Sequence, residues 1–198
     1  MQLSKFSSPL ICIRKKDGRL RIVHSFQNLN RKKVDEKYET HDPNELLNRV
    51  AGSLLITKID ITRAYFQIPI APESEHLTAF NSPFGKYCYK VTAMGLRCAA
   101  SSCQRLVDMI LRNMHRYAGS LQDDIIIFSK DFDSHMGHVK SVLQRLREAG
   151  VTANPKKCSI ACDDLILLGH RVKQGQIFPS DEKIQIVKNW PMPQTKRQ

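Results

Sequence analysis

The stretch LQDDIIIFSK, residues 121–130, places two adjacent aspartates directly before an unbroken apolar run. That run, Ile125–Phe128, predicts a buried β-strand, because β-branched and aromatic side chains fit a covered, pleated sheet. Carboxylates are seldom buried without a partner, so Asp123 and Asp124 at the start of such a strand need compensation. Side chains alternate along a strand, so both carboxylates serve one site only where the chain turns. We therefore predict a hairpin with Asp123 and Asp124 at or beside its tip.

A third carboxylate, Asp60, ends another apolar segment, residues 54–59, which predicts a second strand. If the two strands are neighbours, three acids converge at one end of a sheet, and converging anions repel one another without cations. Mg²⁺ takes oxygen ligands and keeps substrate phosphates in its shell, and two such ions about 4 Å apart suit a phosphoryl displacement. The alternative is that Asp123 and Asp124 are solvated turn residues and that Asp60 caps the following helix.

The chain is strongly basic, with 31 Lys and Arg against 19 Asp and Glu among 198 residues, a net charge of +12. This excess favours a polyanionic partner, with nucleic acid first and an anionic membrane surface second, although a merely soluble basic protein has the same composition. No apolar stretch approaches the ~20 residues of a membrane span. The polar N-terminus lacks the features of a secretory signal, which favours reduced cysteines. We expect a soluble intracellular protein.

Short strands and long amphipathic helices alternate along the chain. Residues 10–13 and 20–23 predict a basic hairpin, and a second hairpin turns at residues 83–86. Apolar residues at helical spacing predict helices over 101–117 and from Asp133 or Ser134 to Gly150. Residues 118–120, Ala-Gly-Ser, are poor strand formers. The order predicts an α+β fold, an antiparallel sheet with helices packed on one face.

Segments along nearly the whole chain resemble, in order, the reverse transcriptases of gypsy-type LTR retrotransposons, which are related to retroviral reverse transcriptases. The family's basic fingers hairpin is similar to SSPLICIRKKDGRLRIV, its first catalytic segment to TKIDITRAYFQIPIAPES, and its Tyr-x-Asp-Asp box to LQDDIIIFSK. Later blocks resemble HMGHVKSVLQRLREAGVTANPKKC, LLGHRV and PSDEKIQIVKNWPMP. The resemblance implies the fingers and palm of a right-hand polymerase, with two helices on one face of the palm sheet and with the thumb and RNase H absent.

The domain boundaries follow from the same resemblance. Residues 1–50 and 72–100 are expected to form the fingers, and residues 51–71 and 101–175 a single palm. Residues 176–198 are expected to begin a linker toward a missing thumb. The implied partners are an RNA or DNA primer–template, dNTPs and further Pol polyprotein domains (protease, RNase H and integrase), with no membrane partner.

The resemblance assigns catalysis and metal binding to Asp60, Asp123 and Asp124, which would hold two Mg²⁺ ions, with Mn²⁺ as a substitute. Lys157, in NPKKC, matches a family lysine that protonates the leaving pyrophosphate. Tyr65 matches a bulky residue beneath the incoming sugar, where a ring would exclude a 2′-hydroxyl; ordinary core packing beside Phe66 is its alternative.

Further residues match the family's binding positions. The set expected to bind the incoming nucleotide is completed by Lys15, Lys16, Arg21, Met94 and Gln122. Primer and template are expected to contact Leu168, Gly169, His170 and Lys156. For each cation the alternative is a solvated surface side chain.

The chain also departs from the family pattern. The tyrosine that normally precedes the aspartate pair is Leu121, and the residue after it is Gln122. His24-Ser25-Phe26-Gln27 lacks an Asp and an Arg of the usual pocket, and Met94 replaces an aromatic. Three hypotheses follow: an RNA-directed DNA polymerase domain, a catalytically inactive truncated remnant that keeps the palm fold and binds nucleic acid, and a basic α+β interaction protein.

Overall fold

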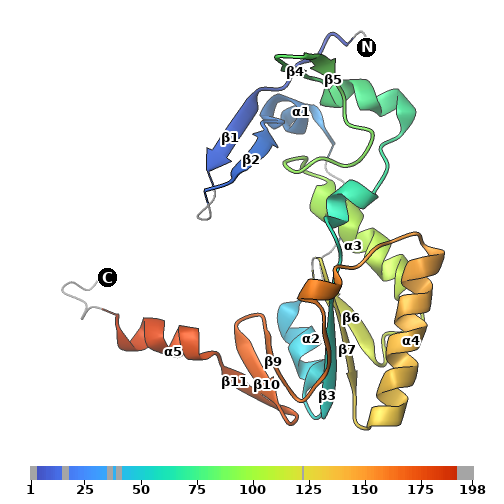
Figure 1. Cartoon of the computed structure of the whole chain (residues 1–198), viewed down its shortest axis with the longest axis vertical. Helices are drawn as coiled ribbons and strands as arrows, with labels where there is room; N and C mark the ends of the chain where they lie inside the picture. Colours follow the sequence, from blue (N-terminus) through green and yellow to red (C-terminus); the bar gives the residue numbers. More distant parts are fainter. Residues whose placement is uncertain (1–3, 15–17, 35–37, 39–41, 122, 191–198) are drawn as a thin grey trace.

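The computed structural model describes residues 4–14, 18–34, 38, 42–121 and 123–190, and Figure 1 shows two bodies with an arm. The upper body, here the hairpin body, contains β1 (Leu10–Arg14), β2 (Leu20–His24), α1 (Gln27–Lys32), η2 (Pro72–Thr78), β4 (Phe80–Ser82) and β5 (Gly85–Tyr87). The lower body, here the sheet body, is built on a four-stranded sheet (Figure 1). Both predicted hairpins form, β1 with β2 and β4 with β5.

The sheet body contains an antiparallel sheet of order β6-β7-β3-β8. Its strands are β3 (Leu55–Asp60), β6 (Ala118–Leu121), β7 (Asp124–Ser129) and β8 (Ser159–Cys162). The central pair, β3 and β7, is in register from Leu55 opposite Ser129 to Asp60 opposite Asp124. The two predicted strands are therefore neighbours, and their acidic ends coincide.

Alternation along the central strands builds two cores. Ile59, Ile125 and Ile127 belong to one core, together with residues of α3 (Ala99–Ile110) and α4 (Phe132–Glu148). Ile56 and Ile126 belong to the other, together with residues of α2 (Pro43–Val50), β9 (Asp164–Leu167) and β10 (His170–Lys173). The expected pair of helices on one face is present, and the opposite face is covered as well.

Helix boundaries follow the capping chemistry of the sequence. At α2, the Asp42 carboxylate accepts a hydrogen bond from Asn44 N–H at 2.8 Å, and Pro43 occupies the first turn. The long helix α4 begins two or three residues earlier than expected, because Asp131 caps it. The helix expected over residues 101–117 ends at Ile110, yet Met114 beyond it is still buried in the same core.

Residues 118–120 form β6, although the sequence disfavours a strand there. Small side chains are needed at this position, since a Cβ on Gly119 would lie 2.6 Å from Leu46 Cδ1 and 3.3 Å from Arg49 Nη1. Arg49 donates to the carbonyl of Ala118 at 2.7 Å and lies 5.5 Å from the centre of the Phe128 ring. Tertiary packing against α2 thus overrides the weak strand propensity.

The arm in Figure 1 consists of β9, β10, β11 (Gln176–Pro179) and α5 (Asp181–Lys188). The sequence places residues 176–198 in a linker, whereas the first part of this segment forms β11 and α5, the latter capped by Ser180. Residues 191–198 lie outside the described residues. Within the described ranges, no helix combines the length and apolarity needed to cross a lipid bilayer.

A hydrogen-bonded chain of side chains joins α4 to the central strands. Fully buried His135 lies 2.7 Å from Thr57 Oγ1 through Nε2 and 2.9 Å from Ser129 Oγ through Nδ1. Ser129 Oγ in turn lies 2.8 Å from His138 Nδ1, and Ala161 N–H donates to Thr57 Oγ1 at 2.9 Å. A neutral His135 protonated on Nδ1 gives each of these four contacts one donor and one acceptor. Burial, and then the charge of His138, lower the pKa of His135.

We predict that the free energy of unfolding decreases as the pH is lowered below about 6.5, the ordinary histidine pKa. The folded protein binds a proton on His135 less readily than the unfolded chain does. The stabilisation that His135 gives the fold is therefore complete above the pKa of this histidine in the unfolded chain, and it is lost as the pH decreases. His24, whose pKa burial also lowers, acts in the same direction. His135→Asn should cost about 1–3 kcal/mol at pH 7.5, because Thr57 and Ser129 lose a partner.

Chemical denaturation at pH 7.5 and 5.5 checks this prediction. The difference in the free energy of unfolding between wild type and His135→Asn should be smaller at pH 5.5 than at pH 7.5. Exposed His115 provides the matched control, since His115→Asn should leave the free energy of unfolding nearly unchanged at both pH values. If His135→Asn loses the same free energy of unfolding at both pH values, His135 is not a neutral buried histidine.

Candidate active site

Three aspartates meet at one end of the four-stranded sheet. Asp60 ends β3 directly opposite Asp124, which begins β7, and Asp123 lies in the turn between β6 and β7. The carbonyl of Asp123 accepts a hydrogen bond from Ile61 N–H at 3.1 Å, which ties this turn to the end of β3. The structure therefore brings together the three acids singled out in the sequence.

Asp123 carries a buried carboxylate oxygen. Its Oδ1 is buried without a hydrogen-bond partner among the described residues. Burial raises the pKa of Asp123, the charges of Asp124 and Asp60 raise it further, and Lys157 opposes the shift. A buried carboxylate oxygen with no donor is a free ligand position for a cation.

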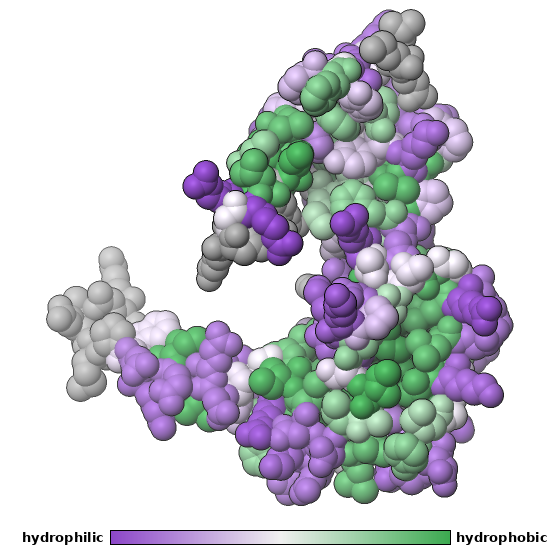
Figure 2. Space-filling view, in the orientation of Figure 1, coloured by the Kyte–Doolittle hydropathy of each residue, from purple (hydrophilic) through white to green (hydrophobic). Residues whose placement is uncertain are grey.

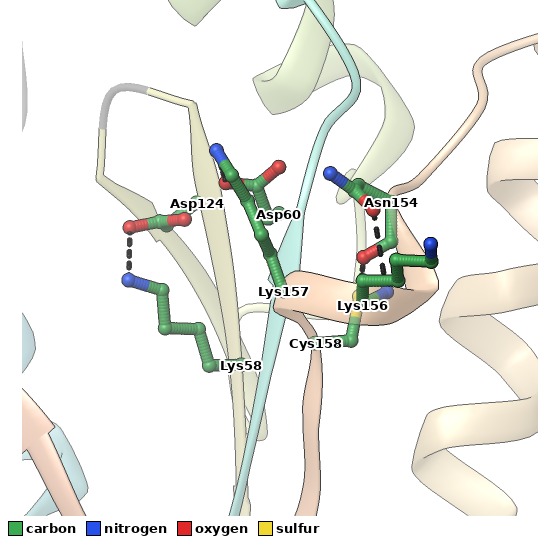
Figure 3. Close-up of polar contacts among 7 residues, drawn as sticks. All are labelled: Lys58, Asp60, Asp124, Asn154, Lys156, Lys157 and Cys158. Atoms are coloured by element: carbon green, nitrogen blue, oxygen red, sulfur yellow. Dashed lines mark hydrogen bonds and ion pairs between the residues drawn. The ribbon is translucent and has the colours of Figure 1, made fainter. Parts of the chain in front are cut away.

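Two lysines neutralise the other two acids (Figure 3). Lys157 Nζ lies 3.2 Å from Asp60 Oδ2, and Lys58 Nζ lies 2.6 Å from Asp124 Oδ2. The first contact joins a predicted catalytic lysine to a predicted metal ligand. The second involves Lys58, which the sequence analysis did not select. A charged residue inside the apolar strand LITKID, two positions before Asp60 and on the same face, was the available signal.

A short loop holds Lys157 at the site. Asn154 N–H donates to the carbonyl of Asp60 at 2.9 Å, and the Asn154 side chain caps η3 (Pro155–Lys157) by accepting from Lys156 N–H at 3.2 Å. Figure 3 shows Lys157 extending from this turn to Asp60, whereas the Lys156 side chain points away from the acids. Of the two lysines in NPKKC, Lys157 is therefore the one at the acid cluster.

Tyr65 lies in η1 (Ala64–Gln67), just after β3, and packs partly buried against the core beneath α3. Burial raises the pKa of its hydroxyl first, and the negative charge of Asp123 raises it further, which places the ring near the acids. The packing of Tyr65 against the core is the alternative stated for it, and its role in excluding a 2′-hydroxyl stays a prediction. The N-cap of η1 is Arg63, with no side-chain cap, so Asp60 is not a helix cap.

The remaining nucleotide-binding predictions are only partly described. Met94 lies partly buried in the turn before α3. Arg21 lies in β2, where its backbone pairs with Ile13. Lys15, Lys16 and Gln122 lie outside the described residues.

Of the predicted primer-binding residues, Leu168 and Gly169 form the turn between β9 and β10, and His170 begins β10, whereas Lys156 lies in η3. Leu168 and Gly169 both have positive φ, 54° and 69°, and the Gly169 carbonyl accepts from Ser180 N–H at 3.1 Å. The φ of Gly169 lies in the left-handed region, which favours glycine, whereas a Cβ at this position would meet only the flexible end of the Lys183 side chain. His170 Nε2 lies 3.4 Å from Lys183 Nζ. Leu168 also lines a small cavity with Lys58 and Asp124, which connects this turn to the acid cluster.

The acid cluster has the donor chemistry of a Mg²⁺ or Mn²⁺ site, because it supplies carboxylate oxygens, one of them unpartnered on Asp123. In the ranges that the structure describes, no three His, Cys, Asp or Glu side chains group closely enough to hold an ion. Asp60 and Asp124 each pair with a lysine instead. Metal binding by the three acids therefore stays a prediction.

Comparison with known proteins identifies the family. The family model described as "Reverse transcriptase (RNA-dependent DNA polymerase)" matches residues 13–185, and the chain belongs to that family. The chain is 30% identical over 191 residues to the Transposon Tf2-3 and Tf2-7 polyproteins of Schizosaccharomyces pombe. These matches cover 96% of this chain and 14% of each polyprotein. The resemblance to retrotransposon reverse transcriptases is confirmed, and the gypsy-type assignment is consistent with these relatives.

Solved structures support the same fold. Foamy viral protease–reverse transcriptase in complex with double-stranded DNA matches with a TM-score of 0.89 and 20% identity, over 99% of this chain and 34% of that one. The same viral protein in complex with an RNA/DNA hybrid matches with a TM-score of 0.85 and 20% identity, over 97% and 26%. The fingers and palm of a right-hand polymerase are thereby confirmed as the fold, while the detailed domain boundaries stay predictions.

We predict that Asp123→Asn raises the melting temperature at pH 7 in EDTA, because it removes a buried charge that two other acids repel. The raised pKa of Asp123 means that its ionised form destabilises the fold at neutral pH, and that the penalty disappears as pH falls through the folded pKa. The rise in melting temperature caused by Asp123→Asn should therefore become smaller as the pH is lowered. Exposed Asp133, in the first turn of α4, is the control, since Asp133→Asn should give no gain. A lower melting temperature for Asp123→Asn would contradict the prediction.

Proposed function

We propose that this chain is the fingers and palm part of an RNA-directed DNA polymerase that transfers a nucleotide from a dNTP to a primer 3′-hydroxyl on an RNA or DNA template. The observation that carries the proposal is the convergence of Asp60, Asp123 and Asp124, with Lys157 beside them, in a member of the reverse transcriptase family. Since the chain spans 14% of the curated relatives it matches, the activity of the complete protein is part of the proposal.

Asp60, Asp123 and Asp124 would hold two Mg²⁺ ions, or Mn²⁺ in their place. When bound, such ions lower the pKa of a primer hydroxyl and neutralise charge on the triphosphate. The protein's contribution is to fix the carboxylates. Backbone hydrogen bonds at Ile61 and Asn154 anchor Asp123 and Asp60, and the β3–β7 ladder anchors Asp124.

Lys157 is suited to protonate the leaving pyrophosphate. Its side chain is 65% exposed and its Nζ contacts Asp60 Oδ2, so the ammonium lies at the mouth of the site and is accessible to a phosphate oxygen. Lys157 Nζ would donate a proton to the departing oxygen while the P–O bond to pyrophosphate breaks and a P–O bond to the primer oxygen forms.

The basic hairpin and the β9–β10 turn supply the polar surroundings that such a reaction needs. Lys15, Lys16 and Arg21 would contact the triphosphate, and Lys156 with Leu168, Gly169 and His170 would contact the primer–template backbone. Phosphate contacts of this kind hold a duplex by its shape and charge rather than by its sequence. The foamy viral structures are complexes with double-stranded DNA and with an RNA/DNA hybrid, which supports nucleic acid as the partner.

A second candidate, an inactive remnant that binds nucleic acid, is favoured by one observation. Asp124 is engaged by Lys58, and the residue two positions before Asp123 is Leu121 instead of the family's tyrosine. Misplaced catalytic groups lose on the order of a hundredfold in rate per ångström. The two candidates predict the same fold and differ in turnover.

Primer extension on an RNA template with dNTPs and Mg²⁺ separates these candidates. We expect extension by the wild type and a loss of at least about a hundredfold in Asp60→Asn, because one carboxylate ligand is replaced by an amide. Asp133→Asn, on the exposed start of α4, should retain wild-type activity. Salt-sensitive duplex binding without any extension would instead establish the inactive remnant.

Tyr65→Ala should raise ribonucleotide incorporation on the order of tenfold or more, because the ring that excludes the 2′-hydroxyl is removed. The measurement is the ratio of dNTP to rNTP incorporation by the active enzyme. Phe66, which stacks on Tyr89 with ring centres 6.2 Å apart, provides the neighbouring control. If Phe66→Ala changes the ratio and Tyr65→Ala does not, Tyr65 is not the gate.

A further inference from the structure

Lys58 lies within the apolar strand β3, on the face that also carries Ile56 and Asp60. Asp60 is directly opposite Asp124 and Lys58 is directly opposite Ile126, so Lys58 and Asp124 are diagonal neighbours across the ladder. Their charged groups meet at 2.6 Å. The strand register therefore fixes this ion pair.

The surroundings of the pair are partly apolar. Leucines 46, 47, 121, 167 and 168 line a cavity of about 50 Å³ together with Lys58 and Asp124. The two side chains are only 29% and 27% exposed. An ion pair shielded in this way is stronger than one on an open surface, since there is less water to screen it.

The pair also determines the direction of the Asp124 carboxylate. In Figure 3, Asp124 points along the sheet toward Lys58, whereas Asp60 contacts Lys157 on its other side. Each lysine thus draws one acid toward itself, and the described acids do not form a three-ligand group. Without these ammonium groups, three like charges would face one another at the end of the sheet.

We propose that Lys58 is a positioning residue that acts through Asp124: an internal counter-cation that neutralises and orients this carboxylate in the metal-free protein and that a divalent cation must displace. This inference rests on the proposed function, because it assumes that Asp124 is a metal ligand. Lys58, the lysine of the TKID segment, would compete with the divalent cation for the Asp124 carboxylate. The consequence is that Lys58 weakens metal binding while it stabilises the metal-free fold.

The test is Mn²⁺ binding by the full chain, measured from the electron paramagnetic resonance signal of the free ion. Lys58→Met keeps the apolar stem of the side chain and removes the charge. It should bind Mn²⁺ more tightly, on the order of fivefold, because the ion no longer displaces a partly screened ion pair. Lys58→Arg keeps a cation and should bind Mn²⁺ within about twofold of the wild type.

A second readout separates positioning from structural support. In EDTA, Lys58→Met should melt at a lower temperature than the wild type, and added Mn²⁺ should raise its melting temperature by more than that of the wild type. Lys173 provides the matched control, because its Nζ lies 3.9 Å from Asp164 on β9, in the arm. Lys173→Met should leave the affinity for Mn²⁺ unchanged.

Each outcome decides the inference. Lower stability with unchanged or weaker Mn²⁺ affinity in Lys58→Met would make Lys58 a structural residue only and would overturn it. Failure of the wild type to bind Mn²⁺ would overturn this inference and the metal-binding part of the proposed function together. Tighter binding in Lys58→Met without primer extension by the wild type would support the inference and reject only the polymerase activity.

Discussion

The antiparallel pairing of β3 with β7 sets Asp60 directly opposite Asp124, and the position of every other part of the site depends on that register. The side-chain period of a strand is two, so a slip of one residue would turn Asp60 and Lys58 to the opposite face and bury their charges in the helix-covered core. The isoleucines of both strands prevent such a slip, because each core requires its own set of apolar side chains. The same pattern that folds the sheet therefore aims the acids.

This arrangement gathers like charges at one place, and the fold contains specific means of tolerating them. Lys157 approaches Asp60 from the capped turn η3, and Lys58 approaches Asp124 from within the sheet. Asp123 has neither a lysine at hydrogen-bonding distance among the described ion pairs nor a donor for its buried Oδ1. The residual unfavourable charge is thus concentrated on one carboxylate, which is where a bound cation would relieve it most.

The other end of the sheet is held by polar contacts. His135 and Ser129 link α4 to the strands, and Arg49 links α2 to β6 and to the ring of Phe128. His135 and His138, which resemble half of a zinc site by spacing, instead flank the Ser129 hydroxyl. These contacts make the sheet a rigid support, and a rigid support limits the misplacement of catalytic groups.

The sequence by itself determined the two apolar strands, both hairpins and the fold class, because these depend on local periodicity and turn chemistry. It also identified the three acids, since each one sits at the end of an apolar run. Only the tertiary structure decided that residues 118–120 form a strand, because close packing against Leu46 and Arg49 outweighs their propensity. The role of Lys58 also required the structure, because a partner 66 positions away follows from the register of two strands and not from either strand alone.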